Sequence, residues 1–295
     1  MYADTSPFSP TGDATATVGM RGRAAVRFGA GEDGRARLKD LYQSSPFRVL
    51  FPTGAADELS TAVLVTTSGG LVGGDRLDVV VDVDADARAQ VLGQAAEKVY
   101  RSNGPDSCVN ATLNVGRGGY LEWLPQETIL FDQARLRRTT TVDVASNGVF
   151  SGAEILLFGR AAMGERLQTG LVRDVWDVRR DGRRVWADAL HLDGDVGAQL
   201  RHPAGFGGAR AAATFVHVCA DVKPRLTLAR MVLKARMVLK DGDVRAAASV
   251  INGVLVVRWL ADEGHVLRAA FAHFWAAFRA QTENLPGVMP RLWHV

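Results

Sequence analysis

The chain has 295 residues, of which 47% are hydrophobic and 23% charged, with a formal net charge of +3. This length and composition are ordinary for a globular protein with a buried core. No segment combines clustered Arg and Lys with interleaved aromatic residues, so we expect no nucleic-acid partner. No run of about 18 apolar residues is present, so we expect no membrane span.

The N-terminal segment and the cysteines indicate the compartment. Residues 1–16 are small and polar and lack the basic and apolar regions of a secretory signal. We interpret them as a disordered leader, followed by a single domain over residues 17–295. The two cysteines, Cys108 and Cys219, form no CxxC pair, which favours a reducing compartment and a cytoplasmic location.

Short strand-like segments follow one another along most of the chain. In residues 76–83, Val79, Val81 and Val83 alternate with polar residues, which is typical of a half-buried strand. Asn-Gly and Asp-Gly pairs, which favour tight hairpin turns, separate several of these segments. The pattern predicts strands over residues 60–67, 76–83, 87–94, 109–115, 120–124, 137–144, 167–178, 212–220 and 254–260.

Helical spacing is clear only near the C-terminus. Between residues 262 and 282, apolar residues recur at helical intervals, with Asp262 as the expected N-cap. A second, short helix is predicted over residues 152–159. The hexapeptide Ala-Arg-Met-Val-Leu-Lys occurs in tandem over 229–234 and 235–240, and we interpret it as a bulge, an extended strand or a longer hairpin. The predicted fold class is mainly β, with many strands and one or two helices.

Several enzyme signatures are absent from the sequence. The glycine-rich segment 68–75 lacks the Lys-Ser/Thr of a phosphate-binding loop and the GxGxxG spacing of a dinucleotide fold. No HExxH motif occurs. The acidic segment from Asp82 to Asp86 begins like a calcium loop but lacks its glycine and its final glutamate. No motif therefore predicts a resident cofactor.

Acidic residues among large apolar ones are the richest candidates for chemistry. Glu122, Glu127 and Asp132 lie in one such segment, and Glu154 and Glu165 flank Arg160 in another. Buried acids must be paired, neutralised or used. They could form structural ion pairs with Arg160, or they could line a path that holds a divalent cation weakly enough to pass it on. His217 and Cys219, two apart on one strand, are weaker metal candidates.

The order and spacing of several motifs resemble the urease accessory protein D family, called H in some organisms. The motifs are residues 68–75 (SGGLVGGD), 95–102 (AAEKVYRS), 121–132 (LEWLPQETILFD), 154–165, 257–261 (VRWLA) and 290–293 (PRLW). The resemblance implies a helicoid-like β architecture without catalytic activity. It implies a scaffold that binds accessory protein F and, through it, the GTPase accessory protein G, and that helps to deliver nickel to apo-urease in a GTP-dependent complex.

The family is thought to carry an internal channel, so nickel is expected only in transit and no cofactor is expected to be bound permanently. The resemblance leads us to expect Asp75, Glu127, Glu154 and Glu165 on the nickel path, supported by Arg160, Glu122 and Asp132. Two alternatives remain open. One is a hydrolase that uses two carboxylates from Glu127, Glu154 and Glu165; the other is a stand-alone nickel-binding protein.

Overall fold

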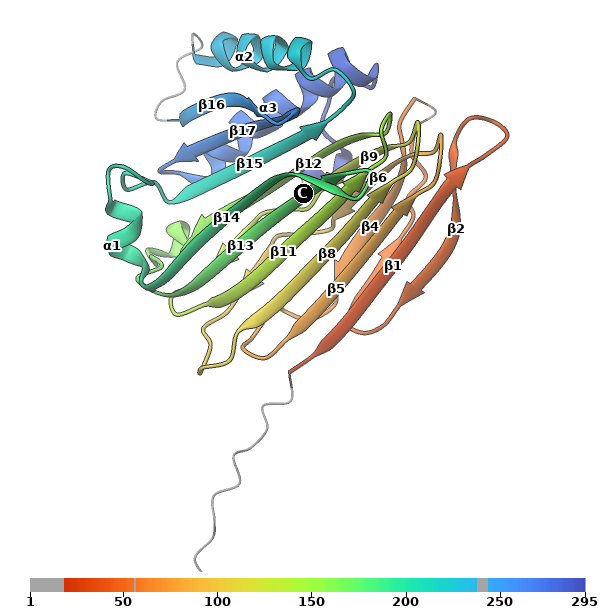
Figure 1. Cartoon of the computed structure of the whole chain (residues 1–295). Helices are drawn as coiled ribbons and strands as arrows, with labels where there is room; N and C mark the ends of the chain where they lie inside the picture. Colours follow the sequence, from red (N-terminus) through yellow and green to blue (C-terminus); the bar gives the residue numbers. More distant parts are fainter. Residues whose placement is uncertain (1–18, 56, 238–243, 295) are drawn as a thin grey trace, which may run out of the picture.

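The computed structural model describes residues 19–55, 57–237 and 244–294 (Figure 1). Strands dominate this part of the chain, which confirms the predicted mainly β class. The strands are β1 (Arg21–Ala30), β2 (Ala36–Gln43), β3 (Phe47–Leu50), β4 (Ser60–Thr66), β5 (Arg76–Val83), β6 (Arg88–Gly93), β7 (Glu97–Val99), β8 (Ser107–Val115), β9 (Tyr120–Leu124), β10 (Thr128–Leu130), β11 (Arg135–Val144), β12 (Val149–Phe158), β13 (Thr169–Arg180), β14 (Arg183–Asp195), β15 (Ala211–Val218), β16 (Val244–Ile251) and β17 (Val254–Ala261).

Helices are confined to the second half of the described chain. They are α1 (Val196–Arg201), α2 (Lys223–Met237) and α3 (Gly264–Glu283), with the 3-10 helices η1 (Ala161–Met163) and η2 (Arg291–His294). The longest, α3, lies near the C-terminus, as predicted. None of the described helices has both the length and the hydropathy needed to span a bilayer.

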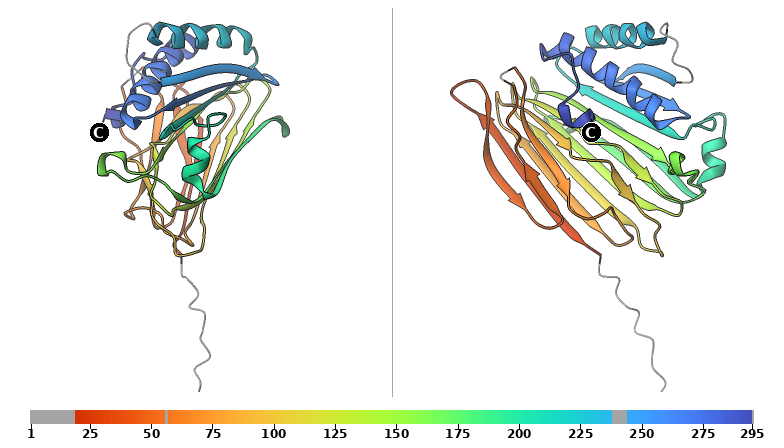
Figure 2. Two further views of the ribbon diagram at one scale, coloured as in Figure 1. Left: turned by 90° about the vertical axis from the view of Figure 1, so that its left-hand side faces the viewer. Right: turned by 180° about the vertical axis from the view of Figure 1, so that it is seen from behind.

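Two sheets face each other across the core (Figure 2). Sheet A has the strand order β14-β13-β11-β8-β5-β1-β2, and sheet B contains β16-β17-β15-β12-β9-β6-β4-β3. Between β4 and β13 the chain passes back and forth between the two sheets, and each passage through both sheets forms one coil. Each new strand pairs in parallel with the strand that the previous coil placed in the same sheet. The short strands β7 and β10 also pair in parallel. These stacked coils give the helicoid-like architecture that the family resemblance implies.

The period-two pattern decides which side chains fill the core. In β5, Leu77, Val79, Val81 and Val83 are buried, whereas the residues between them are exposed or half-buried. Neighbouring strands repeat this alternation in register, so their apolar side chains form continuous layers between the sheets.

A second core joins the C-terminal helices to sheet B. Phe271, Phe274, Trp275 and Phe278 of α3 are buried, and the rings of Phe274 and Phe278 contact the ring of Phe215 on β15. In Figure 2, α2 and α3 lie at the end of the molecule formed by β15, β16 and β17. Because α3 buries one face against sheet B, apolar residues recur at helical spacing in the C-terminal sequence.

Three predictions about local structure are wrong. Of the predicted short helix, residues 152–158 instead belong to strand β12, where burial on both faces removes the alternation that identifies a strand. The first hexapeptide copy lies in helix α2, because Ala229 and Val232 face the core at helical spacing. The N-cap of α3 is Glu263 rather than Asp262, and no side-chain hydrogen bond caps it.

Part of the second hexapeptide copy, residues 238–240, lies outside the described residues, as does the predicted leader, residues 1–16. The leader and the single-domain assignment therefore stay predictions. The Asn252-Gly253 turn behaves as its sequence indicates: both residues have positive φ, 49° and 82°, and they join β16 to β17 in a hairpin.

Candidate functional site

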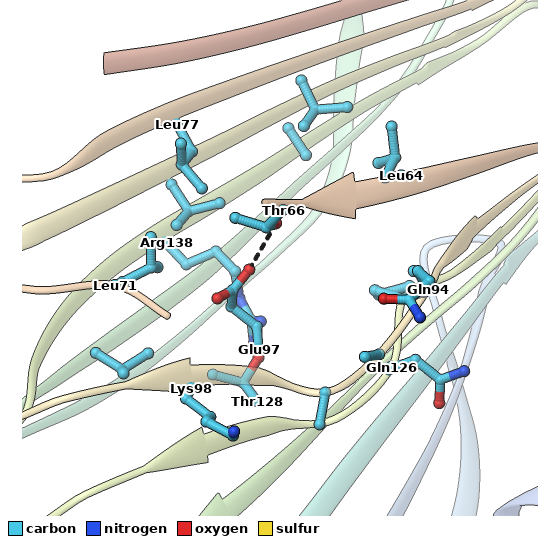
Figure 3. Close-up of a pocket in the computed structure, with 18 of the residues that line it drawn as sticks. Leu64, Thr66, Leu71, Leu77, Gln94, Glu97, Lys98, Gln126, Thr128 and Arg138 are labelled. Atoms are coloured by element: carbon cyan, nitrogen blue, oxygen red, sulfur yellow. Dashed lines mark hydrogen bonds between the residues drawn. The ribbon is translucent and has the colours of Figure 1, made fainter. Parts of the chain in front are cut away.

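A cavity of about 320 Å³ lies between the two sheets. Most of its wall is apolar, but Glu97 of β7 and Glu154 of β12 also line it. In Figure 3, Thr66 of β4 points toward Glu97, and the Thr66 hydroxyl donates a 2.9 Å hydrogen bond to a Glu97 carboxylate oxygen. The wall therefore carries two acids among apolar neighbours.

One buried arginine organises the polar end of this cavity. Arg138 of β11 donates from Nε and Nη2 to both carboxylate oxygens of Asp174, at 3.0 and 2.8 Å. Its Nη1 donates to the Thr128 hydroxyl at 2.9 Å, and its Nη2 also contacts Glu154 Oε2. Thr140 donates a 2.8 Å hydrogen bond to Glu154 Oε1. The cluster is positioned by register, because β11 lies beside β13 and faces β12 across the core.

Burial sets the protonation of the two cavity acids. Desolvation raises the pKa of Glu154 well above its usual value, and the nearby Asp174 carboxylate raises it further, while Arg138 opposes both effects. Desolvation also raises the pKa of Glu97. Two carboxylates share one guanidinium in the cluster, so Glu154 favours its protonated form more than an exposed glutamate does.

A second cavity, also of about 320 Å³, borders the same glutamate. It lies among β12, β13, β14, β15 and β17, and its wall includes Asp174, Trp176 and Trp259. Asp188 and Arg258, which form a 2.7 Å ion pair, are also part of the wall. Glu154 thus borders both cavities, with Arg138 on the wall of the first and Asp174 on that of the second.

The other acids expected on the nickel path lie away from Glu154 in separate contacts. Asp75 is buried and accepts 2.8 Å hydrogen bonds from the backbone N–H groups of Met20 and Val72. Glu127 contacts Arg268 of α3. Neither residue lines the two cavities. Their expected role on the path stays a prediction.

The segment around Arg160 forms a local surface structure. Arg160 pairs with Glu165 at 2.7 Å and stacks over the Phe131 ring at 4.3 Å. Asp132 accepts hydrogen bonds from the backbone N–H groups of Gln168 and Thr169, at 2.8 and 3.0 Å. The structural pairing that the sequence left open thus holds between Arg160 and Glu165, while Glu154 pairs with Arg138 instead.

Glu122 joins sheet B to helix α3. It is completely buried on β9, where its carboxylate accepts 2.9 and 3.1 Å hydrogen bonds from Arg279 and one of 2.9 Å from the Tyr120 hydroxyl. Gln90 also donates to it. The two bonds from Arg279 tie helix α3 to strand β9, so Glu122 anchors the helix.

The two weaker metal candidates have protein partners as well. Nδ1 of buried His217 lies 3.0 Å from the Ser151 hydroxyl oxygen, and Cys219 Sγ donates to the Asp221 carbonyl at 3.2 Å. Among the described residues, no group of three or more His, Cys, Asp or Glu side chains is placed to hold a metal ion.

Burial of His217 leads to a pH prediction. Burial, with a smaller contribution from Arg225, lowers the pKa of His217 from 6.5 to about 3. Protonation therefore favours the unfolded chain, and stability is lost as pH falls from 6.5 toward 3. We expect His217 alone to cost the wild type about 2 kcal/mol of unfolding free energy between pH 6.5 and 5.

Urea unfolding of the wild type and of His217→Gln at several pH values measures this effect. The stability advantage of the wild type over the variant should shrink as pH falls, since the other titrating groups are common to both proteins. Parallel stability curves from pH 7 to 5 would show that His217 becomes protonated in the folded protein as easily as in the unfolded chain.

Sequence reasoning found Glu154 but missed Glu97, Arg138 and Asp174. Arg138 carried a usable signal, since it occupies an inward position between Leu136 and Thr140 in a strand of alternating burial. A charged residue at such a position needs a buried partner. Asp174 carried the same signal, since it lies between the buried residues Val172 and Trp176 of β13. Glu97 gave no comparable signal, because β7 has only three residues.

Comparison with known proteins supports the motif resemblance. The family model of the UreD urease accessory protein matches residues 20–294. A Urease accessory protein UreD from Magnetococcus marinus is 47% identical over 262 residues, covering 89% of this chain and 90% of the relative.

Two further relatives agree. Urease accessory protein UreD 2 of Methylorubrum populi is 44% identical, over 91% of this chain and 87% of its own. Urease accessory protein UreD of Azorhizobium caulinodans is 38% identical, over 88% of this chain and 91% of the relative. The chain belongs to the UreD urease accessory protein family. Family membership supports a role in urease maturation.

Proposed function

We propose that this UreD family member is a non-enzymatic scaffold that joins accessory proteins F and G to apo-urease in the cytoplasm. In a GTP-dependent complex it helps to deliver nickel, which is its cargo rather than a permanent cofactor. Family membership supports the maturation role. The interior supports a passage for a cation, because two cavities meet at a buried carboxylate.

The position of Glu154 is the observation that carries the proposal. Its Oε1 accepts a hydrogen bond from Thr140 and its Oε2 forms an ion pair with Arg138, so the carboxylate is held where the two cavities meet. A divalent cation that moves from one cavity to the other would meet this carboxylate and compete with Arg138 for it.

The chemistry of the cluster suits transfer better than storage. Carboxylate oxygens hold nickel less tightly than sets of imidazoles or thiolates do. Because desolvation raises the pKa of Glu154, protons compete with a cation for this carboxylate, and cation binding is expected to strengthen as pH rises. The positive charge of Arg138 further weakens cation binding, which favours release.

Replacing Glu154 with Gln tests this route. At limiting nickel, we expect about tenfold slower activation of urease in cells that carry the cognate urease operon, equivalent to ~1.4 kcal/mol of lost cation stabilisation. The deficit should shrink at saturating nickel. Urease activity and nickel content per urease subunit are the readouts, and cells without this gene set the baseline.

Glu263→Gln is the matched control, because Glu263 pairs with Arg210, lies outside both cavities and is not expected on the nickel path. Partner capture by each variant should equal that of the wild type. Equal activation by Glu154→Gln and the wild type would remove Glu154 from the route. Unchanged urease activity in cells without the gene would overturn the maturation role itself.

The hydrolase alternative gains no support from the geometry. Glu127, Glu154 and Glu165 contact three different arginines, namely Arg268, Arg138 and Arg160. Of these three carboxylates, only Glu154 lines either of the two cavities described above.

A further inference from the structure

One row of residues crosses the outer face of sheet A, roughly at right angles to its strands. Pairing in register places each member directly opposite the next on six adjacent strands. We call it the arginine row, and its members are, in order from β1 to β14, Arg21, Arg76, Cys108, Arg137, Arg173 and His191.

The row lies on the solvent side of the sheet. Arg21, Arg76, Arg137 and His191 are exposed, and Arg173 is half-buried. In Figure 1, sheet A faces the viewer, and no helix of the described chain crosses its outer face. The row is therefore accessible from β1 to β14.

Most of the positive charge in the row is not neutralised. Arg137 contacts Asp106, which also accepts a 2.6 Å hydrogen bond from Arg135. Within the described part of the chain, Arg21, Arg76 and Arg173 form no ion pair. The row therefore carries a line of positive charge across the sheet, although the net charge of the whole chain is small.

Direct pairing of these arginines across neighbouring strands does not stabilise the fold. Like charges directly opposite each other on neighbouring strands are destabilising. Arg21 lies opposite Arg76, and Arg137 lies opposite Arg173. The alternation of these strands requires only a polar residue at each position, so folding alone does not account for four arginines in one row.

We propose that the arginine row binds the acidic face of an α-helix from a partner protein. Neighbouring strands are about 4.8 Å apart, and a helix rises about 5.4 Å per turn. Carboxylates at successive i, i+4 and i+7 positions lie on one helix face. A helix laid across the strands therefore presents about one carboxylate to each strand, and the long arginine side chains absorb the small difference in spacing.

The row favours an acidic protein over a nucleic acid. Single-stranded nucleic acids are held by aromatic side chains that stack on the bases, in addition to positive charge. The six members of the row include no aromatic residue other than the imidazole of His191. Arginine side chains pair well with carboxylates in two-point contacts.

The proposal rests on the proposed function only in placing the helix on a protein of the maturation complex. Its test uses neither urease nor nickel, so failure here would leave the nickel route standing. The probe is a fluorescent Ala-based helical peptide with Glu at i, i+4 and i+7 positions along one face. A second peptide of the same composition distributes its Glu residues around the helix.

Binding is measured by fluorescence anisotropy with the full chain at about 0.15 M and about 1 M salt. We expect the one-faced peptide to bind the wild type and to dissociate at high salt. The double variant R76E/R173E should bind it about tenfold or more weakly. The matched control R117E/R183E makes the same charge change at two exposed arginines outside the row, and its affinity should fall less than about twofold.

The melting temperature verifies folding. R76E/R173E should melt no lower than the wild type, because each change replaces a like-charge pair with an opposite-charge pair. Equal binding of both peptides, or equal losses in the two double variants, would reduce the row to diffuse charge and overturn the proposal. Tighter binding of a single-stranded oligonucleotide of equal charge would assign the row to nucleic acid instead.

Discussion

Replacing Arg279 with Met is expected to destabilise the folded protein by about 3–5 kcal/mol. The guanidinium is 2% exposed and donates to Glu122 of β9, Glu58 and the carbonyls of Pro286 and Val288. Methionine keeps most of the volume but leaves the completely buried Glu122 without its positive partner. The loss should therefore come from electrostatics and hydrogen bonding rather than from a cavity.

Urea unfolding at neutral pH measures this loss, and Arg291→Met is the control, because Arg291 is exposed near the same end of the chain. The control should cost less than about 0.5 kcal/mol. Adding Glu122→Gln to Arg279→Met should restore part of the stability, since it removes the unpaired charge. A cost below about 1 kcal/mol for Arg279→Met would show that water replaces the guanidinium at this position.

The sequence predicted the fold best where one face of a strand meets solvent. Strand β5 shows its alternation openly and was predicted with its observed bounds, Arg76–Val83. Strand β12 was not predicted, because nearly all of its residues are buried and the period of two disappears. Strand β2 was missed for the opposite reason: apart from Ala36, its residues are exposed, so no apolar face is visible.

The site could be predicted only in part for a related reason. Glu154 was identifiable as an acid among apolar neighbours, which is a local property of the sequence. Its partners Arg138 and Asp174 belong to the strands before and after it, and strand register alone brings them together. Family resemblance supplied the expectation of an internal channel, but several acids assigned to it have structural partners. Acidity in a motif thus does not show whether a side chain faces the interior or the surface.

The second large effect is expected for Arg138, the positive centre of the cavity cluster. Arg138→Met leaves Glu154 and Asp174, both less than 10% exposed, without a cation between them. Removing one partner of such a buried set costs about 3–5 kcal/mol at neutral pH. Arg137→Met is the matched control, because Arg137 is the adjacent residue on the outer face and is exposed, so its loss should cost at most about 1 kcal/mol.

Acid should reverse part of the Arg138→Met defect. Without the guanidinium, nothing opposes the desolvation and the neighbouring Asp174 carboxylate that raise the pKa of Glu154 above its unfolded value. Stability from such groups is present at low pH and is lost as pH rises through the folded pKa. The deficit relative to the wild type should therefore be largest above pH 7 and shrink toward pH 5, in contrast to His217, whose contribution falls in acid.

Adding Glu154→Gln to Arg138→Met separates charge from packing. The double variant should regain stability at pH 7 and lose much of the pH dependence, because the carboxyl with the raised pKa is gone. Urea unfolding of the wild type, both single variants and the double variant at pH 5 and pH 7 completes the cycle. A deficit independent of pH would mean that Arg138 holds the sheets together by its contacts alone. A deficit that grows with pH would identify the cluster as a buried acid pair restrained by one arginine, which is the property that the proposed cation route requires.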